Sequence, residues 1–334
     1  MTAACPSCAA PTAPTDRFCE SCGNPLSGPD IPAAGGVWRS SRAAGGGPCA
    51  GCGGVVGDDA YCEDCGLRRG AGLDRAEDDL PGVAAVTDKG LRKGRNEDAY
   101  AIGVAGGRRA VVVCDGVSSA PDSDLAATTA VDEAIAVLLG GGDIPAAYRA
   151  ASDAVAELAG PGDRFDAPAC TFLAAVVEDG EATVGWVGDS RAYWLDGAGA
   201  RCLTVDDSLA GQLAAAGIDA GALRLSAQAA ALTRWLGADA PAGDPHLVTL
   251  RPGTAGILLL VSDGLTRYAT WSEELLLVTD GLTPYTTWSD GIEGAAGAPE
   301  LARRLTDFAR DAGGADNITV TAVPFEPSRG EPRP

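Results

Sequence analysis

Eight of the chain's 11 cysteines lie in the first 65 of its 334 residues, and all eight belong to Cys-x-x-Cys pairs. Two thiolates separated by two residues can bind one ion from a single tight turn, and two such turns complete a tetrahedral site. A module this short has almost no hydrophobic core, so metal binding must supply its folding free energy. The pairs form two sets: Cys5, Cys8, Cys19 and Cys22, then Cys49, Cys52, Cys62 and Cys65.

Each set predicts one structural Zn²⁺, and the region 1–70 resembles tandem zinc ribbons of the double zinc ribbon kind. Disulfides or redox-active pairs are the alternative, but two regular sets in a chain expected to be cytoplasmic favour zinc. Because such sites are closed, we expect the ribbons to contact a protein partner rather than to perform chemistry. The remaining cysteines, Cys114, Cys170 and Cys202, are expected to be small buried apolar residues.

Composition divides the chain into six segments. Two zinc ribbons are expected at 1–26 and 48–70, a Gly/Pro/Ser linker at 27–47, an acidic linker at 71–82, one large domain at 83–325 and a disordered tail at 326–334. In the large domain, short apolar runs bounded by turn residues predict strands, at 110–114, 172–177, 182–187, 257–261 and 318–323. Alanine-rich stretches predict helices at 124–139, 146–158, 208–216 and 299–312. Strands and helices do not alternate strictly, which favours an α+β fold.

Charge and composition exclude several functions. The chain carries 25 basic and 46 acidic residues, a formal net charge of −21, which disfavours nucleic-acid binding. The ribbons share this bias, with six Arg against eleven acids in residues 1–80. The only histidine, His246, rules out any site that needs two imidazoles. No apolar run is long enough for a membrane span and the N-terminus is not a signal peptide, so we expect a cytoplasmic protein.

Acidic residues recur where apolar runs begin or end. Asp115-Gly116 ends one run, Asp263-Gly264 ends another, Asp316-Asn317 precedes a third, and Glu97-Asp98 occurs in the stretch RNEDAY. Each Asp-Gly alone is more often a turn than a ligand. Together they predict carboxylates that converge in a cleft, where divalent cations would offset their repulsion and activate water for attack on phosphorus.

The motifs RNEDAY, VVVCDGV, CTFLAAVV, VGWVGDSRAYWL, LTRWLG, LLLVSDGL and GGADNITV resemble, in this order, the metal-dependent serine/threonine protein phosphatase family (type 2C, the PPM superfamily). The likeness covers about residues 83–325. It implies a β-sandwich of two antiparallel sheets flanked by helices, in α-β-β-α layers, with two Mn²⁺ or Mg²⁺ ions at its edge.

The resemblance also implies residue roles. Asp115 would bridge both ions, the Gly116 carbonyl would bind one, Asp263 and Asp316 the other, and Glu97 and Asp98 would hold metal-bound waters; Arg92 and Lys93 are the candidates for binding the substrate phosphate. A water that bridges the ions would attack a phosphoserine or phosphothreonine.

The Gly188–Arg191 stretch is expected to be a plain hairpin turn. Arg267 stands where the family usually has an aspartate that can bind a third ion, and Val117 where animal members have a histidine.

A tandem repeat complicates the assignment. Residues 258–274 and 275–291 agree at 12 of 17 positions, so Asp280 duplicates Asp263. The longer interval between Asp263 and Asp316 leaves more room for the predicted helix, so we expect Asp263 to be the ligand and keep Asp280 as the alternative.

Two functions follow from these predictions. The first is a Mn/Mg-dependent phosphatase that acts on phosphoproteins, which we expect to be substrates of serine/threonine kinases, with ribbons that recruit a partner or substrate. The second is a non-catalytic adaptor with a phosphatase fold that works through its ribbons. The first function is favoured because each position whose side chain binds one of the two metal ions in this family holds an acidic residue here.

Overall fold

The computed structural model describes most of the large domain and parts of the N-terminal region. The described residues are 3–4, 11–12, 36–42, 49, 52–56, 61–66, 73–159, 167–217, 231–268, 270–272, 275–277 and 297–327. The first cysteine set (Cys5, Cys8, Cys19 and Cys22), Asp280 and most of the predicted tail therefore lie outside the described residues.

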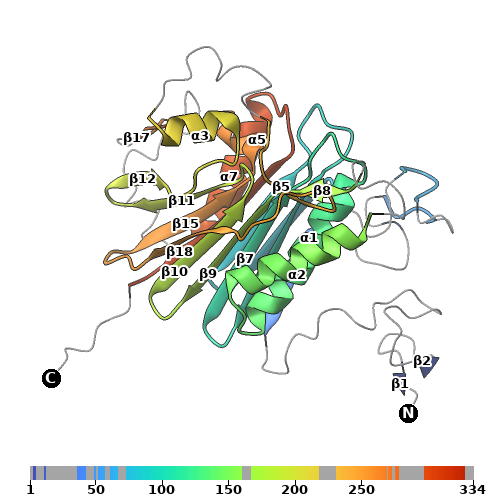
Figure 1. Cartoon of the computed structure of the whole chain (residues 1–334), viewed down its shortest axis with the longest axis horizontal. Coiled ribbons are helices and arrows are strands. Elements are labelled where there is room, and N and C mark those ends of the chain that lie inside the picture. The colour runs from blue at the N-terminus through green and yellow to red at the C-terminus, as the bar shows by residue number, and fades with distance from the viewer. Residues whose placement is uncertain are drawn as a thin grey trace.

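Two six-stranded antiparallel sheets face each other and form a sandwich (Figure 1). The first sheet has the order β14-β10-β9-β7-β6-β3, from β3 (Val37–Ser40), β6 (Asp98–Ala105), β7 (Arg108–Asp115), β9 (Phe172–Glu178), β10 (Glu181–Val187) and β14 (His246–Leu250). The second has the order β12-β11-β15-β18-β5-β4, from β4 (Arg75–Leu80), β5 (Val83–Asp88), β11 (Arg191–Asp196), β12 (Gly199–Cys202), β15 (Gly256–Val261) and β18 (Ile318–Phe325). All five predicted strands are present.

Helices cover both outer faces of the sandwich. Helices α1 (Ser123–Leu139) and α2 (Ile144–Glu157) pack on the first sheet, and α7 (Gly297–Asp311) packs on the second. This α-β-β-α arrangement confirms the predicted fold class. The shorter elements are α3 (Leu209–Ala215), α5 (Asp263–Thr266), and the strand pairs β1 (Ala3–Ala4) with β2 (Pro11–Thr12), β8 (Ala169–Cys170) with β13 (Leu236–Gly237), and β16 (Thr270–Ser272) with β17 (Leu275–Leu277). Within the described part of the chain, none of the helices is both long and apolar enough to cross a bilayer.

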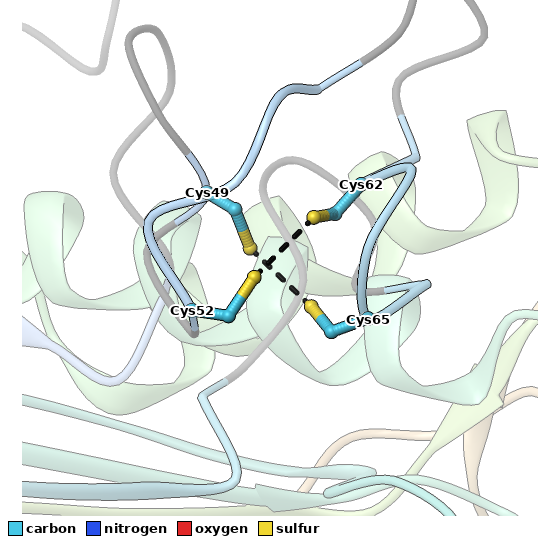
Figure 2. Close-up of side chains that lie close together, drawn as sticks. All are labelled: Cys49, Cys52, Cys62 and Cys65. Atoms are coloured by element: carbon cyan, nitrogen blue, oxygen red, sulfur yellow. Dashed lines mark hydrogen bonds between the residues drawn. The ribbon is translucent and has the colours of Figure 1, made fainter.

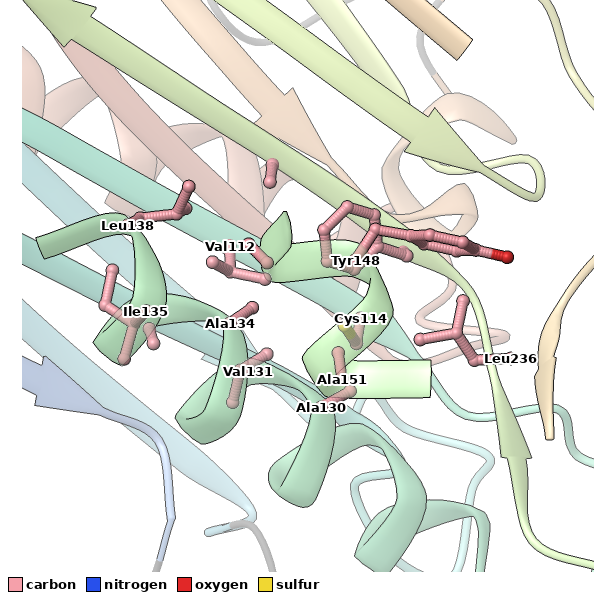
Figure 3. Packing of buried hydrophobic residues seen from close by; sticks show 14 of the residues in the cluster. Val112, Cys114, Ala130, Val131, Ala134, Ile135, Leu138, Tyr148, Ala151 and Leu236 are labelled. Atoms are coloured by element: carbon pink, nitrogen blue, oxygen red, sulfur yellow. The ribbon is translucent and has the colours of Figure 1, made fainter. Parts of the chain in front are cut away.

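The strands read as continuous apolar runs because both of their faces are buried. In β7, Val111 and Val113 pack between the sheets, whereas Val112 and Cys114 face α1 and α2. Small alanines on α1 let the helix lie close to the sheet (Figure 3). Cys114 and Cys170 are fully buried, as predicted, but the prediction for Cys202 was wrong, because it lies exposed at the sandwich edge on β12.

The two predicted linkers both contribute edge strands, so those boundaries were wrong in part. Strand β3, from the Gly/Pro/Ser segment, pairs antiparallel with β6. Strand β4, from the acidic segment, pairs with β5. Arg42, just after β3, lies 2.8 Å from the buried carboxylate of Asp132 on α1. Each strand is short and has charged residues facing solvent, as edge strands often do, which hid the strand pattern in the sequence.

Candidate functional site

Acidic residues from both sheets gather at one end of the sandwich. Asp98 begins β6 and pairs directly with Asp115 at the end of β7. In the other sheet Asp263 begins α5, just beyond β15, and Asp316 lies two residues before β18. Because β15 and β18 are adjacent, these two carboxylates are neighbours, and Arg267 lies within 3.1 Å of both. The structure thus brings together residues that the sequence separates by more than 200 positions.

The glycines that follow two of these aspartates are required by close backbone contacts. A Cβ atom on Gly116 would lie 2.7 Å from the Glu97 carbonyl oxygen and 2.8 Å from that of Ser123. A Cβ atom on Gly264 would lie 1.9 Å from the carbonyl oxygen of Asn317. No side chain fits either place, so each Asp-Gly pair holds its carboxylate against a neighbouring segment rather than in a free turn.

Burial and mutual repulsion disfavour ionisation in this cluster. The pKa of Asp98 rises to about 7, chiefly because the carboxyl is buried, with Asp263 and Asp316 adding to the effect. Burial likewise raises the pKa of Asp115 and, with Asp316, that of Asp263. Oδ2 of Asp98 accepts hydrogen bonds from Ser262 at 2.7 Å and from Thr319 at 2.8 Å. Its Oδ1 is buried and has no hydrogen-bond partner among the described residues.

Two basic side chains reach into the cluster. Nζ of Lys93 lies 2.6 Å from Asp316 and 3.7 Å from Glu97. Burial lowers the pKa of Lys93, but these carboxylates raise it more, so the net shift is upward. The Arg267 guanidinium bridges Asp263 and Asp316. Arg92, the other predicted phosphate ligand, is exposed, and its backbone amide donates to the carbonyl of Gly314 at 3.2 Å.

Glu97 is held by residues that the sequence did not single out. Its carboxylate accepts hydrogen bonds from Ser118 at 3.1 Å and from Ser123 at 2.9 Å. Its backbone amide donates to Oδ1 of Asn317 at 2.9 Å, and the Asn317 amide nitrogen donates to the carbonyls of Lys89 and Arg95. Asn317 therefore fixes the loop that carries Lys93 against the start of β18.

Asp189 was missed by the sequence reasoning. The expected hairpin turn at Gly188–Arg191 was wrong, because β10 and β11 belong to different sheets and this segment crosses between them. The crossing brings Asp189 to the cluster, where burial and then the charge of Asp263 raise its pKa to about 7. Asp189 follows an apolar strand, as Asp115 does, and this position in the sequence could have identified it as a candidate site residue.

The donor set suits hard divalent cations. All the donors are oxygens, several carboxylates repel one another in a partly buried place, and Oδ1 of Asp98 has no hydrogen-bond partner in the described part of the chain. The carboxylate oxygens lie farther apart than the ligand atoms around a single ion. Among the described residues, only the second cysteine set offers three or more ligand atoms that all lie within 4.8 Å of one another. A site for more than one ion fits such a spread.

The side chains of the second cysteine set point toward one another, and their four sulfur atoms all lie within 4.8 Å of each other (Figure 2). The sulfur atoms of Cys49 and Cys65, and those of Cys52 and Cys62, lie 3.5 Å apart. Tetrahedral zinc thiolates have sulfur atoms about 3.8 Å apart, from a Zn–S distance of about 2.3 Å. The backbone amide of Gly54 lowers the pKa of Cys52, but the three neighbouring thiols raise it more, to about 12. A bound cation would reverse that effect and favour the thiolates.

Comparison with known proteins gives one family. The sequence profile described as protein phosphatase 2C matches residues 91–318. Among solved structures, the PPM Ser-Thr phosphatase MsPP from Mycobacterium smegmatis, in complex with cacodylate, is similar, with 29% identity and a TM-score of 0.59 over 75% of this chain and 100% of that chain. The serine/threonine phosphatase PstP/Ppp of Mycobacterium tuberculosis has 26% identity and a TM-score of 0.57, over 73% and 98%.

A further structure, the catalytic domain of the serine/threonine protein phosphatase PstP in complex with two manganese ions, has 25% identity and a TM-score of 0.53, over 73% of this chain and 98% of that chain. No curated protein sequence matched the chain.

Proposed function

Because the chain belongs to the protein phosphatase 2C family, we propose that it hydrolyses phosphoserine and phosphothreonine in proteins with the help of two Mn²⁺ or Mg²⁺ ions. The observation that carries this proposal is the gathering of Asp98, which is buried, with Asp115, Asp263 and Asp316, which are partly buried, at one end of the sandwich. The similarity to a phosphatase structure that contains two manganese ions supports it.

The chain's own residues would divide the work as follows. Asp115, the Gly116 carbonyl, Asp263 and Asp316 would hold the ions, with Glu97 and Asp98 beside them. When bound, the ions supply charge neutralisation and a water made more acidic for in-line attack on phosphorus. The unpartnered Oδ1 of Asp98 is placed to accept a hydrogen bond from a water in the cluster. Such an acceptor would orient the water without a histidine or cysteine nucleophile.

Phosphate binding falls to the loop before Glu97. Nζ of Lys93 lies 2.7 Å from Oγ of Ser118 and beside Asp316, so its direction is fixed before substrate arrives. An ammonium group acts as a point charge and would bind one phosphate oxygen. Arg92 is exposed next to it and could add a second cation for the phosphate. We expect Lys93→Ala to raise KM more than Arg92→Ala does.

The test is a manganese titration of the full chain with p-nitrophenyl phosphate and a phosphothreonine peptide. Asp115→Asn should lower turnover by roughly a hundredfold or more. Asp263→Asn and Asp280→Asn form a matched pair, and we expect the loss only in the first. Loss only in Asp280→Asn would reassign the ligand. Peptide binding without phosphate release at any manganese concentration would support the non-catalytic adaptor instead.

We also propose that Cys49, Cys52, Cys62 and Cys65 hold one structural Zn²⁺ and that the first cysteine set holds a second. The 3.5 Å sulfur separations in the second set support this, being close to those of a zinc tetrahedron. Metal analysis of the purified chain should give about two zinc ions per molecule. Cys49→Ser should remove one of them, whereas Cys202→Ser, at the exposed free cysteine, should remove none.

A further inference from the structure

The segment that contains Cys49, Cys52, Cys62 and Cys65, called here the second cysteine module, is anchored beside the loop that precedes β6 and carries Lys93. The chain leaves β3 at Ser41 and returns at Leu73, and the Leu73 amide donates to the Ser41 carbonyl at 3.1 Å. The two ends of the excursion are therefore clamped together. The side-chain nitrogen of Asn96 then donates to the Leu73 carbonyl at 3.1 Å. Asn96 is 2% exposed and directly precedes Glu97, so the base of the module is tied to the candidate active site.

A cavity separates the module from this loop. It has a volume of about 320 Å³ and is lined by Gly66, Lys93, Gly94, Arg95 and Glu97. Gly66 follows the last cysteine of the module, and a Cβ atom there would meet nothing within 4 Å, so this wall faces open space. The cavity is also lined by Lys93 and Arg95 and by Glu97, which lies within 3.8 Å of both cations. The volume lies at the low end of the range of small-ligand sites and exceeds what one phosphate group needs.

The module also presents apolar side chains to solvent. Val55 is 64% exposed and Tyr61 is 44% exposed, and Leu91, at the start of the loop, is 65% exposed. A polypeptide that extends beyond the cavity could contact such groups, whereas none of the three lines the cavity itself. The cavity and the clamp thus place the module beside the loop that carries Lys93, and the module has apolar side chains exposed to solvent.

We propose that the second cysteine module forms one wall of the substrate cleft and contacts the polypeptide next to the phosphorylated residue. This inference rests on the proposed phosphatase function. It makes the module a specificity element within the catalytic unit, in addition to any separate partner it recruits. Macromolecular substrates would depend on the folded module, and small phosphoesters would not.

The first test compares two substrates in the full chain. The double variant Cys52→Ser/Cys65→Ser should lose one zinc ion and lower kcat/KM for a phosphothreonine peptide by about tenfold, since it removes contacts of hot-spot size. Turnover of p-nitrophenyl phosphate with manganese should stay within about twofold of the parent. Cys202→Ser, on β12, should change neither. Equal losses for both substrates, or none for the peptide, would overturn the inference.

A second measurement uses the unaltered protein and so does not depend on a variant that folds. Amide hydrogen exchange is followed with a peptide that carries a non-hydrolysable phosphonate, and with inorganic phosphate as the control. The peptide should slow exchange in both 61–66 and 91–97, and phosphate only in 91–97. Peptide protection confined to 91–97 would overturn the inference while leaving the phosphatase proposal intact. Failure to turn over either substrate would remove the proposed function and the inference with it.

Discussion

At the scale of single residues, the site is a set of acids that stay close only because something offsets their charge. In the chain itself this role falls to Lys93 and Arg267, which contact the same carboxylate, that of Asp316. Oδ1 of Asp98 has no hydrogen-bond partner among the residues that the structure describes, so this oxygen can accept a hydrogen bond from a bound group. Two consequences can be measured, one on stability and one on metal affinity.

The pKa of Asp98 lies near 7 in the folded protein, against a usual value of 3.8. Between about pH 4 and pH 7 the folded state holds a proton that the unfolded state releases, so stability falls as pH rises, by up to about 1.4 kcal/mol per pH unit. Urea unfolding of the metal-free protein across this range should show the slope, and Asp98→Asn should reduce it. An equal slope in the variant would contradict this origin.

Arg267 binds Asp263 and Asp316 at 3.0 and 3.1 Å and so competes with any cation for them. Arg267→Ala should lower the manganese concentration for half-maximal activity, by about three- to tenfold, as expected for a charge interaction of about 1 kcal/mol. Arg267→Lys keeps the charge and should change this manganese concentration less. A manganese titration of p-nitrophenyl phosphate hydrolysis distinguishes the two, and a higher requirement in Arg267→Ala would refute the competition.

At the scale of elements, the sequence predicted the interior strands and helices well and the edges poorly. The run at 110–114 could be identified because it is apolar on both faces, a pattern that only a covered strand tolerates. The residues of β3 and β4 carry polar or charged groups on their exposed face, and flanking Gly and Pro made them resemble linkers. Pairing with β6 and β5 decides their structure, and no local pattern reveals it.

Strand β3 is held at its end by the ion pair between Arg42 and Asp132, whose carboxylate is buried. Arg42→Ala should lower the free energy of unfolding by about 1–3 kcal/mol, because it leaves a buried carboxylate without its charged partner. The matched control is Arg39→Ala, since Arg39 makes only an exposed hydrogen bond to a neighbouring carbonyl among its described side-chain contacts. Urea denaturation of both variants tests this. Equal effects would mean that the ion pair between Arg42 and Asp132 does not stabilise the fold.

At the scale of the whole molecule, the candidate site could be predicted only as a list of acids. Glu97, Asp98, Asp115, Asp263 and Asp316 stand at the ends of recognisable strands, and their order along the chain resembles one family. The contacts of Ser118, Ser123 and Asn317 with Glu97 depend on the packing of the two sheets, which the sequence does not display. Asp189 was misjudged because a crossing between sheets and a hairpin look alike in sequence.

The formal net charge of −21 should also affect how the protein meets anionic substrates. Repulsion slows their approach, and added salt screens it as the Debye length shrinks from about 30 Å at 0.01 M to about 8 Å at 0.15 M. We therefore expect kcat/KM for an acidic phosphopeptide to rise with salt over this range, at fixed manganese. A basic phosphopeptide is the control and should show the opposite trend. A fall for the acidic peptide would show that local cations dominate the encounter.

The position of β3 ahead of β6 in the chain has a consequence for biosynthesis. A ribosome completes the segment with Cys49, Cys52, Cys62 and Cys65 before it makes the strand that anchors that segment. During this interval the proposed zinc ion would be the group that organises the nascent segment. If zinc is withheld during synthesis, the proposed site would have to fill after the sandwich has formed, so the order of metal addition should affect how much zinc the purified chain holds.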